Sequence, residues 1–396
     1  MVAEYYPRRR DPVLGVWAHR QALAAREAGA GVRVLALERP VPPAAQARDA
    51  LRGRPRPALR TLAAMARQPR RDELDGIGVE YVRFVSPPRR GRYAGWDRWA
   101  RRPLTRALER LHRREPLDLV HAHYALPSGG AAEAFCAAHG LPLVISVHGG
   151  DVLGPELSHP DARDRVGGVL ARAAGVLCNS RATLEAAAAL AGRRDHMRVV
   201  HLGAEAPQAA GPRREQPTVA TLGHVIARKR HGDVLRAVRL ARRERPELRW
   251  LVIGDGPELP ALRALAAELG MGDAVEWAGE LAPQRALEEL ARCHLMALPS
   301  VDEAFGVAYV EALACGVPAI GCLGEGGPEE IAAAGDGMLL VPPGDVEELA
   351  AAIAGALEPQ CLLELSAAAR DTARDSFSWE RCGRATVAAY EEALAT

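Results

Sequence analysis

The sequence has few of the features that mark membrane-spanning, secreted or metal-binding proteins. No apolar run reaches the roughly 18 residues that a membrane-spanning helix needs. Residues 1–10 contain three consecutive arginines and no apolar segment of the kind found in secretory signals. The seven cysteines include no Cys-x-x-Cys pair, so we interpret them as reduced structural thiols. These absences lead us to expect a cytoplasmic protein without a disulfide framework.

Lysine is almost absent, and the charges are unevenly distributed. Of the 51 basic residues only Lys229 is a lysine. Residues 1–205 hold 33 arginines and 21 acidic residues, whereas the remainder holds 18 basic and 29 acidic residues. A basic half suggests an anionic partner, such as a membrane surface, a phosphorylated lipid or an acidic glycan. The alternative is that arginine-rich stretches such as 52–71 and 89–114 are solvated helix faces.

The apolar pattern predicts an α/β protein with two domains. A chain of 396 residues, 48% hydrophobic and 26% charged, is long enough for two globular cores. Continuous apolar runs alternate with Ala-rich stretches at helical spacing, which favours parallel sheets. Six strands are predicted in each half, at residues 32–37, 79–84, 117–121, 141–147, 175–178 and 197–201, and at 218–222, 249–253, 274–277, 295–298, 319–321 and 337–341.

The domain boundaries follow from composition. Residues 206–217 are rich in Pro, Ala and charge without apolar periodicity, so they predict a linker. We expect an N-terminal Rossmann-like domain over 1–205, a second over 218–376, and a C-terminal helix within 377–396 that packs back toward the first domain. Residues 2–7 look like the end of a strand. Either this is a short edge strand or most of the strand precedes Met1.

The most informative segment is residues 298–318, which indicates a strand, a loop and a helix followed by Gly-Val-Pro. Gly306 lies where the helix should begin, so the free N–H groups of Gly306 and Val307 favour a phosphate or a sugar hydroxyl. Glu303 lies in the loop before the helix, and Glu311 lies about a turn and a half inside it. Two glutamates at this spacing are common by chance, so their setting carries the information.

That setting resembles the retaining, nucleotide-sugar-dependent GT-B glycosyltransferases of family 4. Their donor motif has the form E-x-F-G-x-x-x-x-E-A followed by A-x-G-x-P, and Phe305 occupies its aromatic position. The resemblance implies two Rossmann-like domains facing each other across a cleft. Further segments that match the family pattern are residues 147–151 (VHGGD), 223–230 (GHVIARKR), 252–258 (VIGDGPE), 326–331 (GGPEEI), 341–345 (VPPGD) and 377–379 (FSW).

The resemblance assigns roles to residues of the second domain. It implies that Glu311 binds the ribose hydroxyls, that Glu303 faces the donor sugar, and that Lys229 neutralises the diphosphate. A lysine suits this position because its ammonium is a compact point charge. The chain departs from the family at His224, where arginine is usual, so either Arg228 or His224 supplies a second cation, or neither does.

The nucleobase and acceptor regions are less defined. The nucleobase is expected to contact backbone around Gly254 and residues 279–281, including Glu280. In the first domain, His148 matches a family histidine that reaches the donor sugar. Gly15 matches a glycine loop near the diphosphate, although the usual second glycine is missing.

Two further residues of the first domain are weaker acceptor-side candidates. They are His123 and Asp151. His121 and His123 would share one face of a strand, but no third ligand follows at a suitable spacing. We therefore expect no metal and no cofactor, since the nucleotide-sugar is a substrate.

The family implies transfer of a sugar from a UDP- or GDP-sugar to a hydroxyl with retention of anomeric configuration. A cell-envelope, polysaccharide or natural-product pathway is expected. The acceptor is lipid-linked, anionic or neither, and the arginine-rich half suggests peripheral contact with the inner face of the membrane. No nucleic-acid partner is expected. Two alternatives stay open, a non-hydrolysing sugar-nucleotide epimerase and a non-catalytic nucleotide-sugar-binding subunit.

Overall fold

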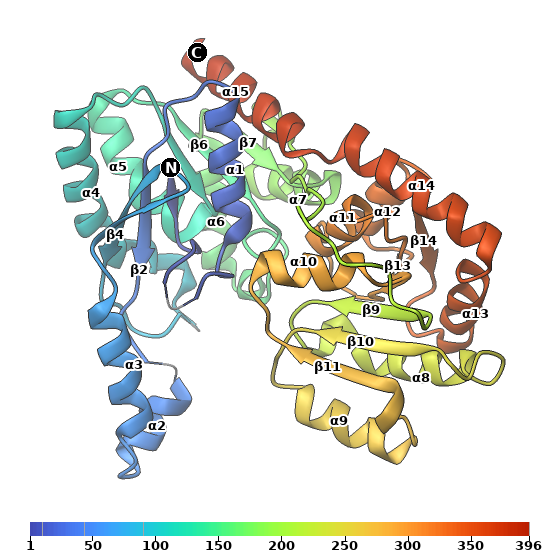
Figure 1. Ribbon diagram of the computed structural model, residues 1–396. Helices are drawn as coiled ribbons and strands as arrows, with labels where there is room; N and C mark the ends of the chain where they lie inside the picture. The colour runs from blue at the N-terminus through green and yellow to red at the C-terminus, as the bar shows by residue number, and fades with distance from the viewer. Residues whose placement is uncertain (10, 43, 90, 396) are drawn as a thin grey trace. The chain divides into compact units, whose positions relative to one another are not determined.

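The computed structural model describes residues 1–9, 11–42, 44–89 and 91–395, and it divides into two α/β units (Figure 1). Unit 1 comprises residues 1–179, 183–200 and those from Cys382 onward, and unit 2 comprises residues 180–182 and 201–381. The chain changes unit between Val200 and His201, shortly before the predicted linker. Arg10, the last of the three consecutive arginines, and Arg90, in the stretch 89–114, lie outside the described residues.

Unit 1 contains an eight-stranded sheet in the order β3-β4-β2-β1-β5-β6-β7-β8. All neighbouring strands are parallel except β3, which runs antiparallel to β4 at the edge. β1 pairs with both β2 and β5, so of the two alternatives for residues 2–7 the short edge strand is wrong, because these residues lie in the middle of the sheet. The strands are β1 (Val2–Ala3), β2 (Val34–Glu38), β3 (Arg71–Leu74), β4 (Ile77–Arg83), β5 (Val120–His123), β6 (Leu143–Val147), β7 (Gly175–Cys178) and β8 (Met197–Val199).

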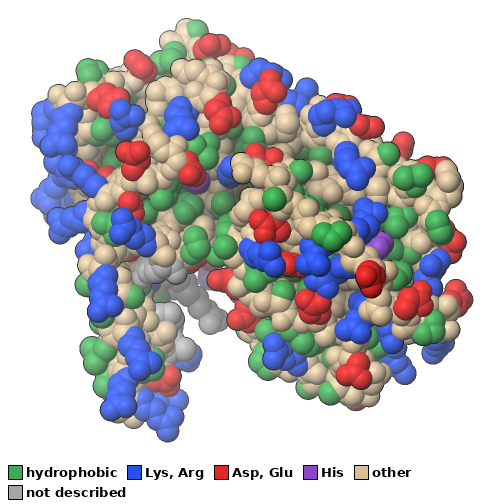
Figure 2. All heavy atoms as spheres, in the orientation of Figure 1, with side chains coloured by type: hydrophobic (Ala, Val, Ile, Leu, Met, Phe, Trp, Pro, Cys, Tyr) green, Lys and Arg blue, Asp and Glu red, His purple; other side chains and the backbone are tan. Residues whose placement is uncertain are grey.

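The helices of unit 1 come from both ends of the chain. They are α1 (Val16–Glu27), α2 (Ala44–Leu51), α3 (Arg56–Arg67), α4 (Asp97–Arg114), α5 (Gly130–His139), α6 (Pro160–Arg172), α7 (Arg181–Ala191) and most of α15 (Trp379–Ala395). α2 and α3 form a hairpin that extends away from the sheet (Figure 1). Basic side chains gather over this hairpin and over α4 (Figure 2).

Unit 2 contains a fully parallel six-stranded sheet in the order β11-β10-β9-β12-β13-β14. Its strands are β9 (Thr218–Leu222), β10 (Arg249–Ile253), β11 (Val275–Gly279), β12 (Leu295–Ala297), β13 (Ala319–Cys322) and β14 (Met338–Val341). Its helices are α8 (His231–Ala241), α9 (Leu259–Glu268), α10 (Pro283–Ala291), α11 (Val307–Ala314), α12 (Gly326–Ala332), α13 (Val346–Ala356) and α14 (Pro359–Ser376).

Each unit has its own hydrophobic core, and the twelve predicted strands are all present. The core of unit 1 centres on β5, β6 and β7, whose side chains are buried on both faces. The core of unit 2 surrounds Trp250, whose Nε1–H donates to Thr221 Oγ1 at 2.9 Å. The α/β class predicted from the apolar pattern is therefore confirmed.

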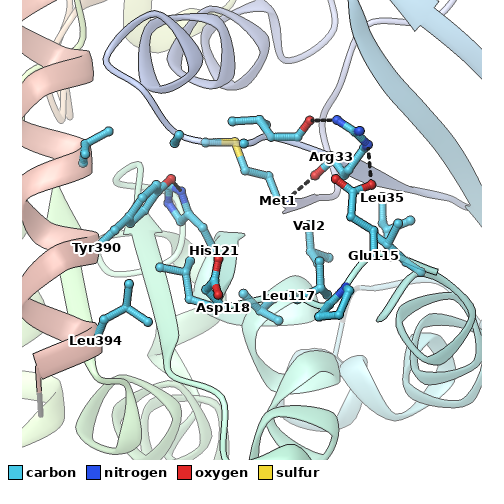
Figure 3. Close-up of a pocket in the computed structure, with 18 of the residues that line it drawn as sticks. Met1, Val2, Arg33, Leu35, Glu115, Leu117, Asp118, His121, Tyr390 and Leu394 are labelled. Atoms are coloured by element: carbon cyan, nitrogen blue, oxygen red, sulfur yellow. Dashed lines mark hydrogen bonds and ion pairs between the residues drawn. The ribbon is translucent and has the colours of Figure 1, made fainter. Parts of the chain in front are cut away.

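The last helix packs on the first part of unit 1. Tyr390 donates or accepts a 2.6 Å hydrogen bond with His121 Nδ1, and Gln21 Nε2 donates to Thr386 Oγ1 at 3.1 Å. A Cβ on Gly383 would lie 2.2 Å from the carbonyl oxygen of Ala24, so only glycine allows this approach. Figure 3 shows the side chains of this region around a cavity of about 350 Å³, with Tyr390 pointing toward His121.

Within the described residues, no single helix is long and apolar enough to cross a membrane; α13 and α14 meet the criterion only as a pair, bent by 92°.

Candidate active site

Two loops of unit 2 converge because the strands before them are neighbours. β9 and β12 are parallel and paired, so the chain leaves both at the same edge of the sheet. The loop after β9 contains a 3-10 turn at Ala227–Lys229, and the loop after β12 contains residues 298–306. The N–H of Val301 donates to the carbonyl of Arg228 at 2.9 Å. This backbone bond fixes the two loops to each other.

The convergence brings the predicted charged residues together. Oε2 of Glu303 accepts hydrogen bonds from Lys229 Nζ and, at 3.4 Å, from Arg228 Nη1. The side chains of Glu303 and Lys229 are only 9% and 11% exposed, whereas that of Arg228 is 39% exposed. Two cations therefore converge on one carboxylate, and the more exposed of them is the guanidinium.

The electrostatics keep Glu303 ionised. Burial opposes its ionisation, but the charges of Lys229 and Arg228 outweigh burial and hold the pKa of Glu303 below its ordinary value. Burial lowers the pKa of Lys229, and the neighbouring Glu303 carboxylate offsets part of that effect. An ammonium has three N–H donors. Because Glu303 uses one of them, Lys229 retains donors for an anionic ligand.

Three residues around Glu303 escaped sequence reasoning: Ser300, Tyr309 and Glu325. Ser300 Oγ donates to Glu303 Oε2 at 3.0 Å and lies 2.9 Å from the hydroxyl of Tyr309, which donates to the carbonyl of Leu298. The N–H of Glu303 donates to Glu325 Oε2 at 2.8 Å. These bonds orient the Glu303 carboxylate. Ser300 lies inside the motif, but nothing in its pattern distinguished it from an ordinary loop serine.

The helix after the loop begins where the sequence predicts. α11 starts at Val307, and Gly306 before it has a φ of 91°, a left-handed conformation that favours glycine. Glu311 lies half-buried on α11. The ring of Phe305 is 1% exposed and packs on His201 and Phe377. The ring belongs to the core, so any contact of Phe305 with a ligand would have to come from its backbone.

Glycines bring the remaining loops of unit 2 close together. Gly254 has a φ of 146°, and a Cβ there would lie 2.0 Å from the carbonyl oxygen of Gly223. Its N–H donates to the carbonyl of Gly279 at 2.8 Å.

Glu280 and His224 are both exposed. Of the two candidates for the second cation, Arg228 is the one that joins Lys229 at Glu303.

Unit 1 contains a stack of histidines at the ends of β5 and β6. His123 Nδ1 lies 3.0 Å from His148 Nε2, with the rings 5.2 Å apart and nearly parallel. His121 stacks on His123 at 4.7 Å. Nδ1 of His148 and Nε2 of His123 are buried without a hydrogen-bond partner among the described residues. Burial lowers the pKa of His148 to about 3, so its imidazole is neutral near pH 7 and can hydrogen-bond a hydroxyl.

Asp151 and Gly15 shape this part of unit 1. The oxygens of Asp151 accept hydrogen bonds from the N–H groups of His148 and Ala125, at 3.0 and 3.1 Å. Asp151 is fully buried. Its two hydrogen bonds hold the loops after β5 and β6 together. Gly15 has a φ of 66°, and a Cβ there would lie 2.2 Å from the Tyr5 carbonyl. The single glycine of this loop is thus required by its contact with the chain after β1.

No group of three or more His, Cys, Asp or Glu side chains in the described part of the chain is arranged to hold a metal ion.

Two Rossmann-like units with a cationic site at the carboxyl edge of the second sheet define the GT-B class of sugar-transferring proteins. The family described as "Glycosyl transferases group 1" matches residues 204–376, and "Glycosyltransferase Family 4" matches residues 14–208. The chain belongs to glycosyltransferase family 4.

Named relatives agree with this assignment. The chain is 31% identical over 307 residues to a D-inositol 3-phosphate glycosyltransferase of Saccharomonospora viridis, covering 70% of each protein. It is 27% identical over 357 residues to a 2-deoxystreptamine glucosyltransferase of Streptomyces kanamyceticus, covering 82% of this chain and 91% of the relative. Two relatives of 40% and 35% identity match over shorter segments, and the chain spans only 15% and 39% of their lengths.

Solved structures share the fold. The Anabaena protein HepE in complex with UDP and glucose superposes with a TM-score of 0.70 at 20% identity, covering 98% of both chains. WaaG, a glycosyltransferase involved in lipopolysaccharide biosynthesis, superposes with a TM-score of 0.64 at 17% identity, covering 97% of this chain and 98% of the other.

Proposed function

We propose that the protein transfers a sugar from a nucleoside-diphosphate sugar, UDP- or GDP-linked, to a hydroxyl acceptor with retention of anomeric configuration. The observation that carries this proposal is the cluster of Lys229 and Arg228 on Glu303 beside the first turn of α11. Departure of a nucleoside diphosphate develops negative charge, and fixed cations and free helix N–H groups stabilise such charge. The structural likeness to a protein that binds UDP and glucose supports UDP as the first donor to test.

The chain's own residues suggest a mechanism without a protein nucleophile. Glu303 is the carboxylate nearest to the cations, and its Oε2 already accepts three hydrogen bonds, so it serves to orient rather than to attack. In the proposed step, the bond between the anomeric carbon and the diphosphate oxygen breaks as the acceptor oxygen bonds on the same face. The acceptor proton passes to the departing diphosphate. Neutral His148 would hydrogen-bond a hydroxyl of the donor sugar.

Donor recognition is assigned to the remaining unit 2 residues as part of the same proposal. Glu311 would accept hydrogen bonds from the ribose hydroxyls, because a carboxylate is a pure acceptor. The backbone around Gly254 and Glu280 would receive the nucleobase. The relatives named above suggest cell-envelope or natural-product glycosylation as the setting.

Cytoplasmic location with peripheral membrane contact is a further proposal, and the α2–α3 hairpin supports it. We call residues 44–70 the arginine hairpin. It contains seven arginines and one acidic residue, Asp49. Leu51, Leu59 and Leu62 are 89%, 58% and 41% exposed. Exposed leucines beside arginines on an amphipathic helix are the pattern that binds anionic bilayer surfaces.

A donor panel tests the proposed function. Thermal unfolding of the wild type and of Glu311→Ala would be followed with UDP-, GDP-, ADP- and TDP-sugars. We expect one nucleotide series to raise the melting temperature of the wild type and to have little effect on the variant, because a ligand that binds only the folded state stabilises it. No shift with any donor would contradict the proposal.

The stereochemistry needs a separate measurement. NMR of the product would show the same anomeric configuration as the donor, and an inverted product would rule out the same-face mechanism. Epimerisation of the donor in the absence of any acceptor would favour the epimerase alternative.

A further inference from the structure

A second cavity in unit 1 lies beside the histidine stack. Its volume is about 240 Å³, and it is lined by Tyr5, Trp17, Arg89, Tyr124, Glu156 and the backbone near Gly150 and Gly154. Tyr5 follows β1, Tyr124 follows β5, and the 150–156 segment follows β6. These three strands are neighbours in the sheet, so the cavity lies at their common carboxyl edge, where parallel sheets bind ligands. We call it the aromatic pocket.

Three aromatic rings line the pocket. The rings of Tyr5 and Tyr124 meet edge to face with centroids 5.3 Å apart, and the rings of Tyr5 and Trp17 are 6.4 Å apart. Trp17 and Tyr124 both contact the ring of His148, at 6.2 and 5.0 Å. Aromatic walls of this kind pack against the C–H faces of a ring and leave its hydroxyls free for polar contacts. Two residues of the pocket thus contact the histidine proposed to face the donor sugar.

The polar groups of the pocket include a buried donor without a partner. Nε1 of Trp17 has no hydrogen-bond partner in the described part of the chain, whereas Nε of Arg89 makes no hydrogen bond but is ion-paired with Glu156. A buried donor left unpaired costs free energy, so the indole N–H in the lining points to a ligand that supplies an oxygen acceptor. Ring hydroxyls supply such acceptors.

The charge of the pocket selects among such ligands. Arg89 is held in place: Nη1 donates to the hydroxyl of Tyr5 at 3.2 Å and lies 3.5 Å from Glu4 Oε2, and Nε lies 3.6 Å from Glu156 Oε1. The guanidinium carbon also lies 4.4 Å above the ring of Tyr93. Two carboxyl groups therefore flank one guanidinium, and burial raises the pKa of one of them, Glu4, to about 7. The ion pair of Arg89 with Glu156 leaves no surplus positive charge for a phosphate, and an ammonium group nearby would favour ionisation of Glu4.

We propose that the aromatic pocket binds the acceptor as a polyhydroxylated ring, a sugar or a cyclitol, that is neutral or carries an amino group and is not phosphorylated at the ring seated in the pocket. This inference rests on the proposed glycosyl transfer, because it treats the ligand beside His148 as the acceptor. It goes further by naming the chemical class of that acceptor and the residues that select it.

Three matched rings test the proposal on the full chain: glucose, glucosamine and glucose 6-phosphate. Saturation-transfer NMR detects weak binding of each without requiring turnover. We expect binding of glucose and glucosamine, and at least roughly tenfold weaker binding of glucose 6-phosphate, because a phosphate would be placed near Glu4 and Glu156. Preference for glucose 6-phosphate, or binding of none of the three, would overturn the proposal.

Variants locate the binding. Trp17→Leu and Glu156→Gln should each weaken binding of glucosamine about tenfold, a loss of the size expected for a stacking or charged hydrogen-bonding partner. Trp99→Leu is the matched control, since Trp99 is 46% exposed on α4 and lies outside the pocket. Equal effects of Trp17→Leu and Trp99→Leu would contradict the pocket assignment.

The donor supplies an independent check in the same samples. UDP should raise the melting temperature of the wild type and of all three variants, which shows that they are folded. Binding of UDP without any binding of rings would refute the aromatic pocket and leave the proposed function standing. Binding of rings without binding of UDP would refute the donor proposal and leave the pocket standing.

Discussion

At the scale of single residues, one ammonium group lies at the centre of the proposed donor site. A chain that uses arginine at every other basic position has its one lysine at 229, where the side chain is 11% exposed and contacts Glu303. A guanidinium is larger and planar, and its donors point in a fixed fork. In the proposed function, the compact ammonium beside Glu303 would meet the diphosphate as a point charge.

Replacing Lys229 should lower the rate of sugar transfer far more than it lowers the stability of the fold. Lys229→Ala is expected to lower kcat/KM by roughly 10²- to 10³-fold, the usual loss when a fixed charge at a leaving group is removed. Stability should fall by only about 1–3 kcal/mol, because Arg228 and Ser300 still contact Glu303. Transfer kinetics and urea unfolding measure the two effects. Arg239→Ala, an exposed arginine of α8, is the matched control.

Lys229→Arg refines the same test. It keeps the charge and changes its shape, so it should recover part of the lost rate. A rate for Lys229→Ala within about twofold of the wild type would exclude the phosphate role.

Some of these residues could be predicted from the sequence and some could not. Lys229, Glu303 and Gly306 lie in short motifs, so their pattern is visible along the chain. Tyr5, Trp17 and Glu156 are far apart in the sequence, and only the order of β1, β5 and β6 in the sheet brings them together. Aromatic residues at such distances look like ordinary core residues until the fold is known.

At the scale of elements, the strands of both sheets were predictable because buried parallel strands are continuous apolar runs. β3 was missed because its sequence, Arg-Asp-Glu-Leu, is polar, and an edge strand exposed to solvent needs no apolar pattern. The place of β1 stayed undecided in the sequence because only two of its residues form ladder pairs, although they lie between β2 and β5.

The arginine hairpin is the element whose sequence was the most ambiguous. Its arginines fit either a solvated face or an anionic partner. In α3, Arg56, Arg60 and Arg67 follow one side of the helix, and the exposed Leu59 and Leu62 lie next to them. None of these three arginines has an ion-pair partner in the ranges that the structure describes. A helix face that is only solvated would not need exposed leucines. We therefore favour an anionic bilayer surface as the partner of the arginine hairpin.

Substitution of the leucines tests this element. Leu59→Glu combined with Leu62→Glu should reduce cosedimentation with vesicles of phosphatidylcholine and phosphatidylglycerol by about tenfold, since apolar contact is lost and negative charge is added. Leu363→Glu is the matched control, because Leu363 is a 67% exposed leucine on α14. Equal binding to vesicles of phosphatidylcholine alone, or an equal loss in the control, would show that the hairpin does not recognise anionic lipid.

At the scale of the whole molecule, buried histidines should make stability depend on pH. Burial lowers the pKa of His148 from 6.5 to about 3. Between these values the unfolded chain binds a proton at this site and the folded protein does not, so stability falls as the pH falls. His148 alone should cost about 2 kcal/mol between pH 7 and pH 5.

A comparison of variants isolates this effect. Burial also raises the pKa of Glu4 to about 7, which acts with the opposite sign because a carboxyl that stays protonated in the fold loses stability as the pH rises. Urea unfolding of the wild type and of His148→Gln should therefore be compared at both pH values. The variant should lose less stability on acidification. Identical pH profiles would show that His148 is not buried as a neutral imidazole.

The position of the last helix has a consequence for how the protein is made. Unit 1 is synthesised first, yet residues from Cys382 onward complete it by covering α1 and His121. Roughly 180 residues of unit 2 must leave the ribosome in between, which takes on the order of ten seconds or more at ordinary elongation rates. During that interval the surface that will receive Tyr390 is bare. Nascent chains of this protein are therefore exposed to chaperones and to aggregation until α15 has been synthesised, and a premature stop before α15 harms the half of the molecule that was translated first.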